Sequence, residues 1–305
     1  MFQKIKAHGR IFKNIFQVLI VCGLFFFLGF NLYKSWNEIK GYDFQFNYGF
    51  LVLSICFMLL LYAMTAVNYY FLLKKMGLPV TLRKVTKARI ITDIMGYIPG
   101  KVWTLLGRFY YLNKGQITKM EISVSTVIEF IIMIVSGSII AVALILITGM
   151  DNPSLQPYYY MPIASIFVLL ILIHPKIITF IVRKFEKIFK IPNARINLRY
   201  KDIIFIISLY IPYWLAGGLM LFFLISSLTP VSFASILQII GIYAASCAIS
   251  IVTFIAPAGL GIREGIMSFL LAFYIPLPIA IIISILLRVI FIIIGSALAL
   301  MAKKL

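Results

Sequence analysis

Acidic residues are scarce in this sequence, and charged residues of either sign are few. Only 12% of the 305 residues are charged, whereas about 25% are charged in an average soluble domain. Lys and Arg number 28 against 9 Asp and Glu, and the hydrophobic share reaches 63%. This composition leaves too little polar surface to cover a water-soluble globule. Soluble enzymes and disordered chains are therefore excluded.

Cysteine and histidine are scarce too, with three and two residues. Cys22, Cys56 and Cys247 lie far apart inside apolar stretches, a pattern that predicts neither a disulfide framework nor a metal site. His8 and His174 have no partner at the spacing of metal ligands. We therefore expect no bound metal, and the absence of a nucleotide-binding motif leads us to expect no cofactor.

Long apolar runs make up most of the chain. A run of about twenty residues is long enough to cross about 30 Å of hydrocarbon as a helix. Such runs predict six full spans, at about 14–36, 48–73, 121–150, 159–181, 203–228 and 277–301. Two further apolar stretches, about 85–111 and 233–274, are interrupted by Pro and Gly. The predicted fold class is all-α, a polytopic membrane protein.

Basic residues gather in alternate connections between these runs. They precede the first run and follow the second and the fourth, whereas residues 150–160 and 227–233 include no Lys or Arg. Cytoplasmic loops carry the excess of Lys and Arg. We therefore expect a multi-pass protein of the plasma (inner) membrane with both termini in the cytoplasm. The net charge of +19 then reflects topology, and we expect no nucleic-acid partner.

The same charge pattern constrains the two interrupted stretches. Basic residues flank the first on both sides, and the second follows an uncharged connection and leads into a last span that ends inside. Each stretch should then enter and leave the membrane on one side, as a re-entrant hairpin, and the two hairpins should have opposite orientations. A competing count treats 262–274 as a short full span, which gives eight spans with the same terminal locations.

The order of span, hairpin and span occurs twice, over about 48–150 and about 203–301, with Pro99 and Pro257 at corresponding positions. The second copy should be inverted, because its first span runs outward. We expect the two copies to form a single integral membrane domain over 1–305. Inverted repeats with Pro- and Gly-broken segments at matching positions indicate a transport site near the membrane midplane.

The first break lies between Asp93 and Arg108 and contains Pro99-Gly100 followed by Lys101. Proline removes a backbone donor and glycine allows unusual dihedral angles, so a helix should stop here and restart. Lys101 and Arg108 then share one stripe of the restarting helix, and its N-terminus with two cations suits a phosphate group. Alternatively, both side chains extend to the cytoplasmic headgroups.

The second break contains Pro257, Gly259 and Gly261, and Arg263 and Glu264 follow directly. Charges at membrane depth are costly, and they usually pair or face a cavity. A cation at a helix N-terminus also opposes the helix dipole, and a bound anion would remove that conflict. The alternative is a structural ion pair with a neighbouring helix.

These patterns give two predicted sets of functional residues. The predicted substrate-binding residues come from both breaks: Lys101, Arg108, Arg263, Glu264, Pro99, Gly100, Pro257, Gly259 and Gly261. The predicted gating or charge-pairing residues are Glu129, Arg288 and Asp93. In the repeat, Glu129 corresponds to position 287, the neighbour of Arg288, so Glu129 and Arg288 are expected to pair. Asp93 is expected to pair with Arg89 or with the basic residues near the first break. No residue pattern indicates catalysis.

The residues around the breaks resemble the transmembrane, flippase-like region of lysylphosphatidylglycerol synthases. The matching features are Pro99-Gly100, Gly107-Arg108, Gly115, Glu129 and the more specific motif Pro257-x-Gly259-Leu260-Gly261-x-Arg263-Glu264-Gly265. The resemblance covers nearly the whole chain. It implies translocation of lipids between leaflets. Since no aminoacyl-transferase domain follows the last span, we expect a stand-alone member that is not an enzyme.

The expected function is therefore movement of an anionic lipid, either a phospholipid or a polyprenyl-phosphate-linked sugar, with membrane lipids as partners. One alternative is a membrane-embedded transferase acting on a lipid-linked phosphate. Another is a subunit that scaffolds a cell-envelope assembly. The oligomeric state stays open, a homo-oligomer included.

Overall fold

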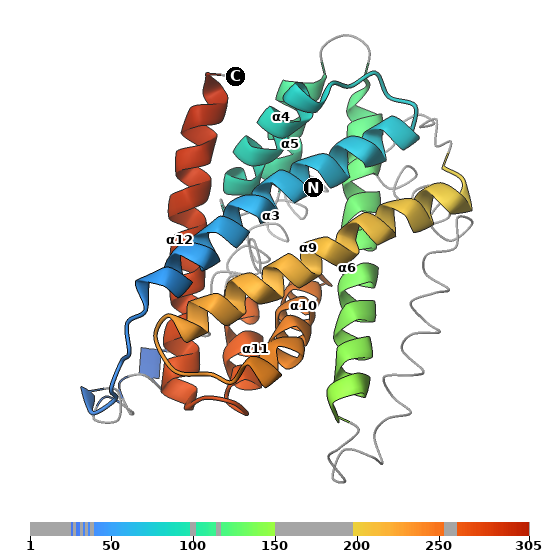
Figure 1. Ribbon diagram of the computed structural model, residues 1–305. Coiled ribbons are helices and arrows are strands. Elements are labelled where there is room, and N and C mark those ends of the chain that lie inside the picture. Colours follow the sequence, from blue (N-terminus) through green and yellow to red (C-terminus); the bar gives the residue numbers. More distant parts are fainter. Residues whose placement is uncertain are drawn as a thin grey trace, which may run out of the picture.

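The computed structural model describes residues 40–97, 102–113, 117–149, 198–252 and 261–304, with a few single positions between 26 and 36. Over this part the secondary structure is helical throughout, without a strand (Figure 1). Five helices are long and apolar enough to cross a membrane: Tyr48–Lys75, Lys119–Thr148, Tyr200–Ser226, Phe233–Ile251 and Leu277–Lys303. The predicted all-α polytopic membrane fold is confirmed.

The long helices match the predicted spans closely. Helices α3 (Tyr48–Lys75), α6 (Lys119–Gly149), α9 (Tyr200–Ser226) and α12 (Leu277–Lys303) take the places of four of them. The predicted span at 159–181 lies outside the described residues, and the one at 14–36 lies almost entirely outside them.

Each interrupted stretch forms a pair of shorter helices. The first gives α4 (Leu82–Met95) and α5 (Val102–Leu112), and the second gives the short 3-10 helix η2 (Phe233–Ser235), α10 (Ile236–Val252) and α11 (Ile262–Leu271). With ten residues, α11 measures about 15 Å and is too short to cross the membrane. The competing interpretation of 262–274 as a full span is therefore not supported, although Phe233–Ile251 in the same stretch is long and apolar enough to cross a membrane.

The two helix pairs lie at opposite ends of the molecule. The C-terminus marks one end of the molecule. Helix α3 finishes and α6 begins at that end, and α4 and α5 lie there too (Figure 1). Helix α9 ends and α12 begins at the other end, where α10 and α11 lie (Figure 1). Each stretch thus returns to the end it came from, as expected for hairpins of opposite orientation.

The packing follows the repeat. Helices α3 and α9 pack along each other, α4 packs against α12, and α10 packs against α6. Each hairpin therefore rests on the last long helix of the other half. Close approach of α9 to α10 depends on two glycines, because a Cβ on Gly217 would collide with the Tyr243 ring and one on Gly218 with the main chain of Ile240. Small residues at such positions are typical of helix packing in membranes.

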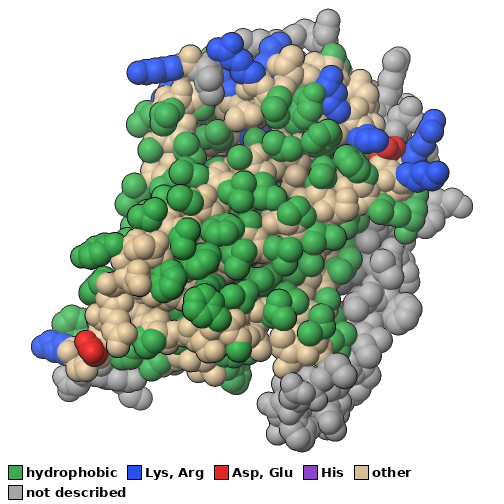
Figure 2. Space-filling view, in the orientation of Figure 1, with side chains coloured by type: hydrophobic (Ala, Val, Ile, Leu, Met, Phe, Trp, Pro, Cys, Tyr) green, Lys and Arg blue, Asp and Glu red, His purple; other side chains and the backbone are tan. Residues whose placement is uncertain are grey.

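Apolar side chains cover the outer face of α3 and α9 (Figure 2). Most Lys and Arg side chains on this face lie toward the end of the molecule where the C-terminus is found (Figure 2). Large apolar side chains are exposed on both helices: Val52, Leu59, Leu60, Ile204, Ile211 and Leu215. Soluble proteins rarely expose so continuous an apolar surface. This face is therefore a lipid-facing surface.

Candidate functional site

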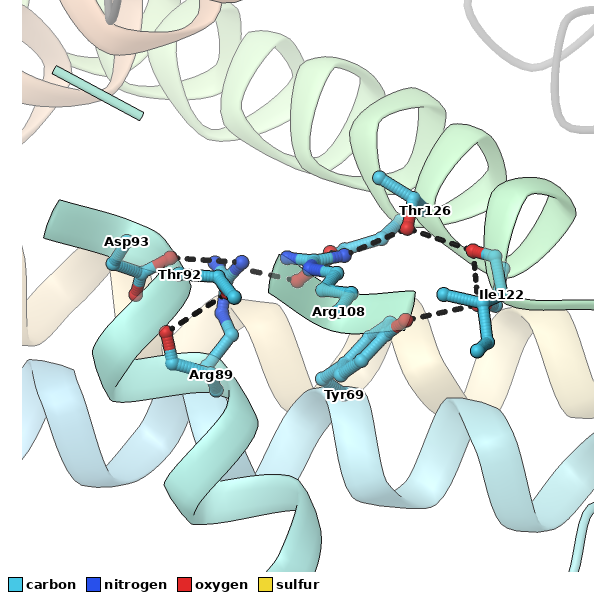
Figure 3. A network of polar contacts seen from close by, with 9 residues as sticks. Tyr69, Arg89, Thr92, Asp93, Arg108, Ile122 and Thr126 are labelled. Atoms are coloured by element: carbon cyan, nitrogen blue, oxygen red, sulfur yellow. Dashed lines mark hydrogen bonds and ion pairs between the residues drawn. The ribbon is translucent and has the colours of Figure 1, made fainter. Parts of the chain in front are cut away.

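Four charged side chains from three helices form one group, the first cluster, and Figure 3 labels three of them, Arg89, Asp93 and Arg108. Arg89 and Asp93 belong to α4, Arg108 to α5 and Glu129 to α6. Arg89 Nη1 lies 3.0 Å from Asp93 Oδ1, the pairing expected from their spacing, and Arg89 Nη2 lies 3.3 Å from Glu129 Oε1. Arg108 Nη1 lies 2.7 Å from Glu129 Oε2. Two cations and two carboxylates thus balance each other.

Arg108 is held on two sides. Its Nη1 donates to Thr126 Oγ1 at 3.0 Å, and its guanidinium lies 4.3 Å from the ring centre of Tyr69 on α3. The Tyr69 hydroxyl is in turn 2.9 Å from Ser125 Oγ. With 0% of its surface exposed, Arg108 does not extend to the headgroups, so that alternative is wrong for this side chain. Its guanidinium bonds protein groups within the first cluster.

Glu264 and Arg288 form the second cluster, between α11 and α12. Arg288 Nε donates to Glu264 Oε1. Glu264 Oε2 accepts a hydrogen bond of 2.7 Å from the Gly261 N–H, which caps the start of α11. Gly261 has a φ of 80°, in the left-handed region that favours glycine. Glu264 therefore both starts α11 and binds α12.

The predicted pairing of Glu129 with Arg288 is wrong. Glu129 binds Arg108 within its own half, and Arg288 binds Glu264 within the other. The reason is geometric, because the short helix of each hairpin lies against the long helix that follows it in the chain. The two pairs have opposite polarity, with the arginine on the short helix in the first half and on the long helix in the second.

Arg263 is in a different situation. Within the described part of the chain it has no carboxylate partner. Its guanidinium carbon lies 5.4 Å from the ring centre of Tyr243 on α10 and 5.3 Å from that of Phe291 on α12. Its Nη2 is buried and makes no hydrogen bond to a described residue. A cation between two aromatic faces with an unused donor is suited to an anion.

Side chains of the first half reach this region. Tyr97, directly after α4, has its ring centre 5.4 Å from the guanidinium carbon of Arg288. Tyr62 of α3 donates a hydrogen bond of 2.9 Å to the carbonyl of Phe291, whose ring faces Arg263. The end of α4, where the first hairpin is broken, and the start of α11 therefore lie near each other, around Arg263 and Arg288.

Several predicted site residues cannot be placed by this geometry. Pro99, Gly100, Lys101, Pro257 and Gly259 lie outside the described residues. The sequence also gave no signal for Tyr69, Tyr97, Tyr243 and Phe291 as contacts of the arginines, since aromatic residues make up 15% of the chain and occur in every apolar run. Among the described residues, no group of three or more His, Cys, Asp or Glu forms a candidate metal site.

Comparison with known proteins gives one family. The protein-family model described as "Lysylphosphatidylglycerol synthase TM region" matches residues 14–299. That range includes both hairpins and both charged clusters. No curated protein sequence matches the chain.

Proposed function

The chain belongs to the family of the lysylphosphatidylglycerol synthase TM region, and from this premise we propose that it moves an anionic lipid between the leaflets of the membrane. Family membership supports a function connected with membrane lipids. The observation that carries the finer proposal is Arg263, which lies between Tyr243 and Phe291 with a buried, unused donor. The group that Arg263 would bind is the phosphate that phospholipids and polyprenyl-phosphate-linked sugars have in common.

The balance of charges supports an anionic ligand. In the first cluster two arginines face two carboxylates, so that the charges cancel. Around α11, Glu264 forms its ion pair with Arg288, and no described carboxylate lies within ion-pair distance of Arg263. An uncompensated charge at membrane depth costs several kcal/mol. A lipid phosphate would remove this cost.

The arrangement of the halves supports transport. Two oppositely oriented hairpins bring their broken ends to one region, and each packs on the last helix of the other half. Rocking of one half against the other around a fixed site is a common mechanism in inverted-repeat transporters. We propose that the basic end with the C-terminus faces the cytoplasm of a plasma membrane, because positive charge favours that side.

The transferase alternative has less support. It requires a carboxylate free to act as a base near the cations. Glu129 is fully buried and bound to Arg89 and Arg108. Both oxygens of Glu264 are engaged, with Arg288 and with the Gly261 N–H. Asp93, the remaining candidate, is paired with Arg89 at 3.0 Å in the first cluster. The described geometry beside Arg263 therefore offers no free carboxylate, and it favours binding of a phosphate over attack on it.

Lipids that co-purify with the protein test this assignment. We expect mass spectrometry of the detergent-extracted protein to find one class of anionic lipid enriched over the bulk membrane. Arg263→Gln should reduce that enrichment by about tenfold or more, since a charged hydrogen bond contributes about 1.5–3 kcal/mol. Arg83→Gln, at an exposed position, is the matched control and should keep the lipid. The same enrichment in wild type and Arg263→Gln would contradict the role of Arg263.

A further inference from the structure

The two carboxylates of the first cluster are held very differently. Glu129 is 0% exposed and lies within ion-pair distance of both Arg89 and Arg108. Asp93 has one arginine partner among the described residues, Arg89, and its side chain is 23% exposed. A partly exposed carboxylate at membrane depth requires contact with water or with a polar group, because hydrocarbon does not solvate it. Asp93 is thus the accessible member of the cluster.

The position of Asp93 on its helix also disfavours its charge. It lies in the last turn of α4, which ends at Met95. The C-terminal end of a helix carries partial negative charge and stabilises cations, so a carboxylate there is opposed by the dipole. Glu264, by contrast, lies in the first turn of α11, where a carboxylate is favoured. Within the first cluster, Asp93 thus combines partial exposure with an unfavourable position on its helix.

The groups that act on the charge of Asp93 come from every helix around it. The charged groups are Arg89 on its own helix, Arg108 on α5 and Glu129 on α6. The tyrosines are Tyr97, just after α4, Tyr62 on α3 and Tyr213 on α9. Arg288 on α12 faces Tyr97. Within the described part of the chain, Arg89 is the only cation that contacts Asp93 directly. Since Arg89 also contacts Glu129, it retains a carboxylate partner when Asp93 is neutral.

From this geometry we infer that Asp93 is a proton-binding site coupled to lipid movement. The Asp93 carboxylate takes up one proton from water on one side of the membrane, becomes a neutral carboxylic acid, and releases the proton to water on the other side after the lipid has moved. While the proton is bound, the first cluster carries one surplus positive charge on Arg89. Arg89 and Tyr97 belong to the same segment, and the Tyr97 ring lies 5.4 Å from the guanidinium carbon of Arg288. The surplus charge therefore arises in the half whose end at Tyr97 contacts the region of Arg288 and Arg263.

The inference rests on the proposed function, with the proton as co-substrate. One proton that accompanies a lipid with a single negative charge makes the cycle electroneutral. A pH gradient then drives movement, and a membrane potential does not. Each pH unit supplies a free energy equal to about a tenfold ratio of lipid between the leaflets.

A spectroscopic titration tests proton binding without reference to transport. Infrared difference spectra of the protein in lipid nanodiscs, recorded over a series of pH steps, should contain the band of a protonated carboxyl that is lost in Asp93→Asn. The control is Asp202→Asn, which changes an aspartate that lies 2.9 Å from Lys75 at the start of α9. This control should retain the band. A band that persists unchanged in Asp93→Asn would overturn the inference.

A transport measurement tests coupling. In vesicles with fluorescent phosphatidylglycerol, a gradient of one pH unit should shift the leaflet distribution by up to about tenfold with wild type and Asp202→Asn. With Asp93→Asn the lipid should equilibrate without regard to the gradient. Gradient-independent equilibration by wild type would refute proton coupling but leave lipid translocation standing. A gradient-driven shift with Asp93→Asn would refute the role of Asp93.

Discussion

Glu129→Gln is expected to lower the free energy of unfolding by about 3–5 kcal/mol, because removal of one partner leaves a buried charge uncompensated. Arg108 has no exposed surface, and Glu129 is its carboxylate partner. The Thr126 hydroxyl and the Tyr69 ring remain beside it, but neither carries a negative charge. The first cluster would then hold two arginines against Asp93 alone. Unfolding by SDS in mixed micelles measures the loss.

Two further variants make this prediction specific. Glu121→Gln makes the same chemical change at the first turn of the same helix, where Glu121 Oε2 accepts a hydrogen bond from the Thr118 N–H, and should cost about 1 kcal/mol or less. The double variant Arg108→Gln/Glu129→Gln removes one charge of each sign, so Arg89 and Asp93 still balance. It should be more stable than Glu129→Gln alone. A single variant as stable as wild type would show that the ion pair contributes nothing to folding.

Substitution of Glu264 is expected to have the second-largest effect, in two separable parts. Glu264→Gln removes the negative charge beside Arg288 and should cost about 3 kcal/mol, while its amide oxygen can still accept from the Gly261 N–H. Glu264→Ala also removes that acceptor and should cost about 1 kcal/mol more, the usual contribution of a helix N-terminal contact. The same SDS titration compares the two variants.

The order of the two variants decides the interpretation. If Glu264→Ala and Glu264→Gln are equally stable, the hydrogen bond of 2.7 Å to Gly261 does not stabilise the start of α11. If Glu264→Gln is as stable as wild type, the carboxylate is not needed to hold Arg288. Either result would contradict the structural role that we assign to Glu264.

The helices could be predicted from sequence because membrane spans are encoded by length and apolar composition. The spans that became α3, α6, α9 and α12, and the interruption of the two hairpins, follow from local rules about hydrocarbon thickness and about Pro and Gly. The hairpin orientation followed from the positions of Lys and Arg. These signals lie within a few residues of the features they determine.

The pairing of charges could not be predicted in this way. A shift of one residue rotates a helical side chain by roughly 100°, so the partner of Glu129 depends on how α5 and α6 pack. The repeat alignment brought Glu129 close to Arg288 in register, but Arg108 and Glu264 lie on helices in direct contact with them. The aromatic contacts of Arg263 likewise join α10, α11 and α12, and no single segment encodes them.

The central claim is that Arg263 serves the passage of an anionic lipid, and lipid translocation in reconstituted vesicles tests it most directly. Vesicles that contain a fluorescent phosphatidylglycerol are prepared with wild type, Arg263→Gln or Arg83→Gln, without a pH gradient, and the label on the outer leaflet is quenched over time. The account predicts rapid movement by wild type and Arg83→Gln, and movement slowed about tenfold or more by Arg263→Gln. Equal rates for wild type and Arg263→Gln, or no movement above protein-free vesicles with any anionic lipid tested, would contradict it.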